Sequence, residues 1–152
     1  MPFTINDDKT INHPAIKDFL ADCNKATNGD LLSVQYVQTY DLIKYSKWLI
    51  ISEYDDEKND FKFRYSGSKV CSFYGMEITG KYISETASED NIEPLINIYK
   101  DIIKTRNTVY LSGTLKPRGK AFIDWHMVSQ PLIRNDQINE VIGFVIFDDN
   151  ST

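Results

Sequence analysis

The stretch from Phe61 to Thr86 limits most strongly what this chain can fold into. It begins with an alternating pattern that places Phe61 and Tyr65 on one face of a strand. Gly67 ends the alternation, and two further glycines divide the residues that follow into short segments. A strand that leads directly into compact helical turns is typical of a pocket wall. Such walls occur in sensing modules more often than in catalytic ones.

The composition indicates one folded domain. The chain has 152 residues, of which 41% are hydrophobic and 26% are charged, so it is long enough to bury a core without disulfide bonds or metals. Nine tyrosines and eight phenylalanines favour a core or pocket walled by aromatic rings. The net charge of −5 argues against a nucleic-acid partner, which would require a basic surface.

The same sequence indicates a cytoplasmic protein. No apolar stretch approaches the roughly 20 residues of a membrane span, and the first residues lack the basic start and apolar run of a signal peptide. Cys23 and Cys71 are too few for a secreted disulfide framework and have no metal-ligand spacing. We therefore expect a reducing compartment and no contact with a membrane.

Local patterns predict the elements of the first half. An amphipathic helix is expected to begin at Pro14 and to end before Asn28. The segment from Leu31 to Tyr40 is ambiguous in period and is interpreted as mostly extended, after which Thr39 could cap a short helix. Two strands, Trp48 to Tyr54 and Phe61 to Ser66, should form an antiparallel hairpin.

The second half should contain one long helix and three strands. Ser88 is the expected N-cap of the helix, whose apolar face would include Leu95 and Tyr99. The three strands are predicted at Thr108 to Leu115, Ala121 to Ile133, and Glu140 to Phe147. The predicted order is therefore helix, two strands, short helices, long helix and three strands.

This order and several motifs resemble the PAS domain family. The likeness is to a bacterial PAS subfamily in which an RY-x-G strand end, here Arg64, Tyr65 and Gly67, leads into a G-x-x-x-T-G segment, here Gly75 to Gly80. The upstream segments HPAIKDFL and YDLIKYSKWLIISEYD, and the later NTVYLSGTLK, are also similar to that subfamily. The resemblance covers nearly the whole chain.

The resemblance implies an α+β fold with a five-stranded antiparallel sheet in the order 2-1-5-4-3. Helices would cover one face of this sheet, and an N-terminal amphipathic helix would precede it. Residues 1–45 would form a helical extension packed on the domain, 46–148 the PAS-like domain, and 149–152 a tail. PAS proteins hold a ligand or side chains in the cleft between sheet and helices, and they signal through protein contacts. We therefore expect a non-catalytic sensory or regulatory domain with an unidentified signalling protein as its partner.

If the cleft is open, a small apolar or aromatic ligand fits the composition best. The candidate pocket residues share large or aromatic side chains and are Tyr65, Val70, Phe73, Tyr74, Met76, Ile83, Leu95, Tyr99, Trp125 and Met127. A closed hydrophobic core built from the same residues stays open as the alternative. Some PAS members bind anions, but the four candidate arginines are expected at the surface; they are Arg64, Arg106, Arg118 and Arg134.

Known PAS cofactors find no matching motif. A haem sensor of the common kind requires an axial histidine on the long helix, and Ser88 to Arg106 contains none. A flavin photosensor requires a cysteine within an N-C-R-F-L-Q helix, which differs from the residues around Cys71. The cofactor is therefore unknown, with haem and flavin disfavoured, and no metal site is expected.

Two other classes of function stay open. The chain could be a ligand-free interaction or dimerisation module, with Ile16, Phe19 and Leu20 of the leading helix at the contact and a homodimer as one result. Alternatively, Asp124 and His126 lie two residues apart on one strand and could serve a small cone-shaped isomerase or dehydratase as base and orienting group.

Overall fold

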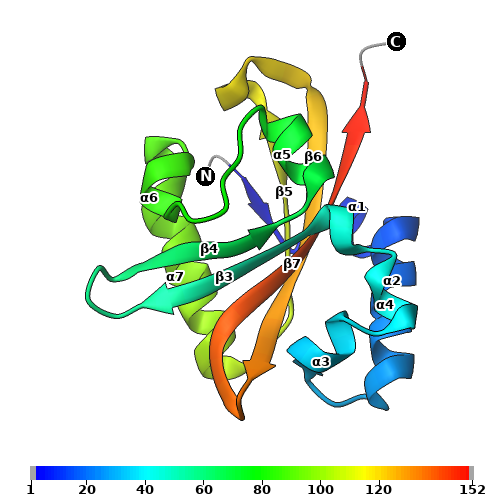
Figure 1. Ribbon diagram of the computed structural model, residues 1–152. Helices are drawn as coiled ribbons and strands as arrows, with labels where there is room; N and C mark the ends of the chain where they lie inside the picture. The colour runs from blue at the N-terminus through cyan, green and yellow to red at the C-terminus, as the bar shows by residue number, and fades with distance from the viewer. Residues whose placement is uncertain (1–2, 151–152) are drawn as a thin grey trace.

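A computed structural model of the chain describes residues 3–150, which form a central sheet between two layers of helices (Figure 1). The strands are β1 (Thr4–Ile5), β2 (Leu32–Ser33), β3 (Leu49–Asp55), β4 (Asp60–Ser66), β5 (Val109–Leu115), β6 (Lys120–Arg134) and β7 (Gln137–Asp149). The α-helices are α1 (Asp8–Ile11), α2 (Pro14–Thr27), α3 (Val34–Val37), α4 (Tyr40–Ile43), α5 (Ser68–Tyr74), α6 (Ile83–Thr86) and α7 (Glu89–Thr105). Two 3₁₀ turns, η1 (Ser46–Trp48) and η2 (Lys116–Arg118), complete the chain.

The five long strands have the predicted order. They lie as β4-β3-β7-β6-β5, which is 2-1-5-4-3 in the numbering of the five expected strands, and neighbours among them pair antiparallel. The sequence did not predict β1, which pairs with β5, or β2, which pairs parallel with β6. Each of these strands has two residues, too few to show an alternating pattern.

The sheet is covered on both faces. One core cluster lies between the sheet and α5 to α7 and includes Phe61, Tyr99 and Met127. The other lies between the sheet and α2 to α4 and includes Phe19 and Phe144, whose rings stack with centroids 4.6 Å apart. Figure 1 shows α6 and α7 on one side of the sheet and α2 to α4 on the other. The expected N-terminal helix therefore occupies the face that the PAS helices leave uncovered.

This packing buries two of the three residues predicted at an interface. Ile16 is 0% exposed and Phe19 is 2% exposed, because both side chains insert between α2 and the sheet. Leu20 is half-buried and packs against the same cluster. A partner could not reach Ile16 or Phe19 without displacing α2.

Helix boundaries follow the capping signals in the sequence. α2 begins at Pro14 and ends at Thr27, as predicted, and Asn28 takes the left-handed conformation with φ 54°. Ser88 occupies the N-cap position of α7, but its hydroxyl makes no capping hydrogen bond. The interpretation of Leu31 to Tyr40 as mostly extended is wrong, since α3 takes up Val34–Val37. A single helical turn has no room for a 3.6-residue period.

The N-terminal segment contributes directly to the sheet through β1 and β2. Of the tail expected at 149–152, Asp149 is the last residue of β7, and residues 151 and 152 lie outside the described residues.

Two histidines connect the N-terminal helices to the sheet. Nε2 of His13 lies 3.3 Å from the Asp148 carboxylate on β7, and Nε2 of His126 lies 3.4 Å from the same group. Nδ1 of His126 is 2.7 Å from the hydroxyl oxygen of Thr10, while Nδ1 of His13 accepts a hydrogen bond from the backbone N–H of Ala15. The cluster joins α1 and α2 to β6 and β7. His126 is 7% exposed within it.

This cluster should make folding sensitive to mild acid. Burial lowers the pKa of His126 below its ordinary 6.5, and the neighbouring His13 lowers it further. The carboxylates of Asp148, Asp124 and Asp7 raise the pKa, but by less in total. The folded chain therefore binds a proton at His126 less readily than the unfolded chain, and stability should fall as the pH decreases below 6.5. We expect the free energy of unfolding, from urea titrations followed by tryptophan fluorescence, to decrease between pH 7.5 and 5.5.

The matched variant is His126→Asn, which keeps a polar group beside Thr10 but does not titrate. It should show a smaller decrease over the same pH interval, and the carboxylates common to both proteins cancel in the comparison. Equal decreases in the two proteins would show that protonation of His126 is not coupled to folding.

Candidate functional site

A cavity of about 350 Å³ lies between the sheet and the layer of α5 to α7. Its lining is largely apolar and includes six aromatic side chains among 21 residues. The sheet and the strand ends contribute Ile50, Phe63, Thr114, Leu115, Trp125, Met127, Val145 and Phe147; the helices and their connections contribute Val70, Tyr74, Ile78, Glu85, Thr86, Ala87, Ser88, Asn91, Leu95 and Tyr99; Phe3, Pro117 and Arg118 complete the wall.

Glycines on β5 and β7, the two strands that flank β6, position the floor of the cavity. Gly113 of β5 pairs with Trp125 of β6, and a Cβ at Gly113 would lie 2.8 Å from the indole ring. Likewise, a Cβ at Gly143 of β7 would lie 2.9 Å from the sulfur of Met127. Because glycine leaves this space open, the side chains of Trp125 and Met127 can lie close to the backbone of the adjacent strands. Larger residues at either glycine would push these side chains into the cavity.

Two tyrosines fix the helical side of the cavity. Tyr99 of α7 is 3% exposed, its hydroxyl lies 3.9 Å from the sulfur of Met127, and burial raises its pKa to about 12. The hydroxyl of Tyr74 donates a hydrogen bond to the carbonyl of Thr86, which joins α5 to the end of α6. Both hydroxyls are therefore neutral at physiological pH and hold the wall in place.

The structure brings six of the ten candidate pocket residues to the cavity: Val70, Tyr74, Leu95, Tyr99, Trp125 and Met127. Phe73 lies behind the lining, stacked on Phe147 with centroids 4.4 Å apart. Ile83 is 0% exposed in the core, and Met76 packs half-buried against that core. Ligand contact by the six lining residues stays a prediction.

Tyr65 lies outside the cavity because of a β-bulge. In the β3–β4 ladder Ile51 pairs with Tyr65, but Ser52 pairs with Phe63, so Arg64 is an extra residue on β4. The side chains beyond the bulge exchange faces. Tyr65 is consequently 38% exposed and its hydroxyl donates to the carbonyl of Ser46 at 2.7 Å.

Sequence reasoning missed the contribution of Arg118. This residue was expected at the surface, but it is half-buried and lines the cavity. Its Nε donates to the carbonyl of Tyr74 at 2.9 Å, and Lys120 donates to the carbonyl of Phe73 at 2.9 Å. These are carbonyls of the last turn of α5, where cations are favourable. The basic turn K-P-R-G gave no sequence signal of this contact, because Arg118 lies 44 residues from Tyr74 along the chain.

Phe3 and Asn91 were also missed, for different reasons. Phe3 reaches the cavity through the pairing of β1 with β5, and a two-residue strand leaves no pattern in the sequence. Asn91 is a polar residue in the first turn of α7, three positions after the N-cap. The sequence does not show which face of α7 lines the cavity, so a polar residue such as Asn91 could not be recognised as part of the lining.

Gly67 of the RY-x-G motif lies in the connection that holds the start of α5. At Gly67 a Cβ would lie 2.2 Å from the carbonyl oxygen of Lys47, so no larger residue fits this close approach. The backbone N–H of Gly67 donates to the carbonyl of Leu49 at 2.8 Å. The start of α5 is thus fastened to η1 and to the beginning of β3.

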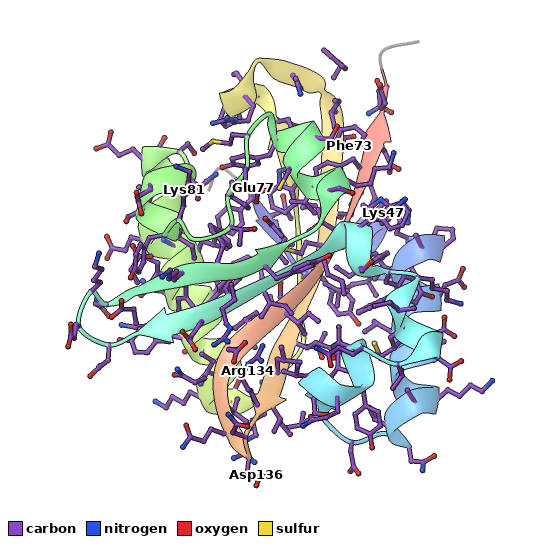
Figure 2. All side chains as sticks on the ribbon, viewed as in Figure 1. Lys47, Phe73, Glu77, Lys81, Arg134 and Asp136 are labelled. Atoms are coloured by element: carbon purple, nitrogen blue, oxygen red, sulfur yellow. The ribbon has the colours of Figure 1, made fainter. Side chains whose placement is uncertain are left out.

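Glu77 organises the loop after α5 (Figure 2). Its carboxylate accepts hydrogen bonds from the backbone N–H of Thr79, the hydroxyl of Ser66 and the thiol of Cys71. The side chain and backbone of Thr79, with Ser66 and Cys71, lower the pKa of Glu77 to about 2. Thr79 of the G-x-x-x-T-G motif, with Ser66 and Glu77 at unspecified positions of the two motifs, therefore holds the shape of this loop, and Cys71 is part of the same network.

The enzyme alternative does not coincide with the cavity. Asp124 and His126 are absent from its lining, and His126 lies instead against Thr10 and Asp148 on the side of the N-terminal helices. Asp124 accepts a hydrogen bond from Asn150 at 3.0 Å. Across residues 3–150, no group of three or more His, Cys, Asp or Glu side chains is arranged to hold a metal ion.

Comparison with known families identifies the class of this protein. The family model described as PAS domain matches residues 47–146, which is most of the chain, and the chain therefore belongs to the PAS domain family. No curated protein matches the sequence. Within the described part of the chain, no helix is both long and apolar enough to cross a membrane. The family makes this protein a sensory or regulatory domain of a generally non-catalytic class.

The contact at Gly67 gives a direct test of how α5 is held. We expect Gly67→Ala to lower the free energy of unfolding by about 2 kcal/mol, because a methyl group would force the backbones of η1 and α5 apart. Urea denaturation followed by circular dichroism measures the loss. The control is Ser68→Ala at the next, exposed position, where the expected change is within about 0.5 kcal/mol. Similar stabilities of the two variants would contradict the close packing at Gly67.

Proposed function

We propose that this chain is a non-catalytic PAS sensory domain that binds a small apolar or aromatic ligand in its cavity and signals through a protein partner. The observation that carries this proposal is the cavity of about 350 Å³ beneath α5 to α7. Small-molecule sites are typically concave, mostly apolar and roughly 300–1,000 Å³ in volume. The aromatic wall suits a flat, apolar ring system.

The contacts of α5 provide a route from the cavity to the surface. Val70 and Tyr74 of α5 line the cavity, while the start of the same helix is fastened at Gly67 to η1. η1 directly precedes β3 and follows the N-terminal helical layer. A ligand that binds one position of α5 better than another would shift the population of that position, and the change would reach η1 and the surface beside it.

Other functions receive less support. A ligand-free interaction module would need neither the open volume nor the polar groups in its wall, and Ile16 and Phe19 are buried under α2. For an enzyme based on His126, the buried position of that side chain is unfavourable. Haem and flavin stay disfavoured by the missing motifs, and the two free cysteines agree with the reducing, cytoplasmic location that we propose. A homodimer that responds to the ligand is one form that the output could take.

Ligand binding should depend on the free volume beside Leu95. Native mass spectrometry of the purified chain, compared with its denatured mass, should reveal a retained small molecule. Leu95→Trp would fill part of the cavity. The fraction of protein molecules that retain the small molecule should therefore decrease by a factor of about ten or more. Light scattering of the loaded and emptied protein would show whether the ligand also changes the oligomeric state.

The control variant is Asn97→Trp, which adds the same side chain at an exposed position of the same helix, outside the cavity lining. It should retain the molecule as the unmodified protein does. A protein that is repeatedly empty, and that takes up none of a panel of apolar aromatic compounds, would favour the interaction module. Carbonyl turnover that is lost in His126→Ala would favour the enzyme.

A further inference from the structure

We propose that the ligand of this cavity is an aromatic carboxylate, whose ring lies against the apolar wall and whose carboxylate binds the guanidinium group of Arg118. The inference rests on the proposed function and adds the chemical class of the ligand. Among the lining residues that the structure describes, Arg118 is the only one with a positively charged side chain. The charge of this side chain therefore selects the polar group of the ligand.

The guanidinium group is fixed against a residue of the cavity wall. Its Nε donates to the carbonyl of Tyr74 at 2.9 Å, and its Cζ lies 4.5 Å from the centroid of the Tyr74 ring. Tyr74 lines the cavity and is itself held by its hydrogen bond to the carbonyl of Thr86, another lining residue. These contacts restrict the guanidinium group before any ligand arrives, which lowers the entropic cost of binding to it.

Most of the hydrogen-bonding capacity of Arg118 is unused. An arginine side chain has five N–H donors, and the one on Nε is used at Tyr74. Within residues 3–150, Nη1 and Nη2 take part in no hydrogen bond or ion pair. These two atoms form the planar fork that binds both oxygens of a carboxylate. A ligand carboxylate would provide the acceptors that the protein does not.

The other charged residue of the lining, Glu85, does not neutralise this group. Its carboxylate accepts a hydrogen bond from the backbone N–H of Tyr82 at 3.1 Å, and the residue is exposed to solvent. Arg118 is half-buried, so a carboxylate bound to it would keep part of its hydration and avoid the full cost of burying a charge. One unpaired cation matches one negative charge, which favours a carboxylate over a phosphate group.

The apolar remainder of the cavity favours an aromatic ring. Tyr99, Trp125 and Phe147 line the wall together with Leu95 and Val145. Rings that pack against aromatic side chains gain stacking or edge contacts beyond the burial of apolar area. The ligand is therefore a flat apolar body with one carboxylate at its Arg118 end.

Two compounds of nearly the same shape test this inference: 2-naphthoate and 2-naphthamide. They share the bicyclic ring and a planar polar group, but only 2-naphthoate is charged at pH 7. Binding to the emptied full-length chain is measured from amide chemical shifts in NMR titrations. We expect 2-naphthoate to bind about tenfold more tightly than 2-naphthamide, because hydrogen bonds between two charged groups are the stronger ones.

Variants assign this preference to the guanidinium group. In Arg118→Gln the two compounds should bind about equally, and an unchanged affinity for 2-naphthamide would show that the cavity is intact. The matched control is Lys116→Gln, which makes the same change of net charge at an exposed position of the same turn, outside the lining. It should keep the tenfold preference. If Arg118→Gln does not fold, Arg118→Lys decides, because it keeps the charge but lacks the fork and should bind 2-naphthoate less tightly than the unmodified protein.

The outcomes separate the ligand class from the proposed function. Equal affinities of the unmodified protein for the two compounds would overturn the carboxylate and leave ligand binding intact. A preference for 2-naphthoate that persists in Arg118→Gln, or that is unchanged in Arg118→Lys, would overturn the role of the guanidinium group. Failure of both compounds to bind would overturn the ligand class together with the proposed function.

Discussion

The pairing of β7 with β3 and β6 is the interaction on which the rest of the structure depends. β7 joins the hairpin of β3 and β4 to the group of β1, β5 and β6, and it pairs with β6 along nearly its whole length. Its alternating residues supply both cores, since Phe144 faces α2 and Val145 faces the cavity. Removing this strand would separate the sheet into two parts, and neither part could cover the helices that pack on it.

The cavity follows from an uneven distribution of side-chain size over this sheet. Gly113 and Gly143 allow Trp125 and Met127 to lie close to the sheet, while Tyr74 and Tyr99 hold the helical wall at its distance. The free volume therefore depends on glycines in the sheet and on fixed tyrosines in the helical layer.

Periodicity and capping signals were sufficient to predict the long elements, whereas the order of the five main strands was predicted from the family resemblance. The periodic patterns also indicated six residues that line the cavity, because Trp125 and Met127 alternate on β6, and Leu95 and Tyr99 lie on one face of α7. The failures arise where one residue changes the geometry. The bulge at Arg64 turns Tyr65 away from the cavity. β1 has only two residues, so no sequence pattern predicts that Phe3 reaches the cavity. The apolar face of α2, which includes Ile16 and Phe19, could cover either the sheet of its own chain or a partner protein. An amphipathic pattern alone does not distinguish these two arrangements.

The central position of β7 also has a consequence for biosynthesis. The ribosome produces the chain from its N-terminus, so α2 and the β3–β4 hairpin emerge long before the strand that pairs with β3 and covers Phe19. At about 5–20 residues per second, the apolar faces of these elements stay without their main partner for several seconds. During that interval the nascent chain exposes surfaces that chaperones recognise, and the sheet can close only after β7 has left the exit tunnel.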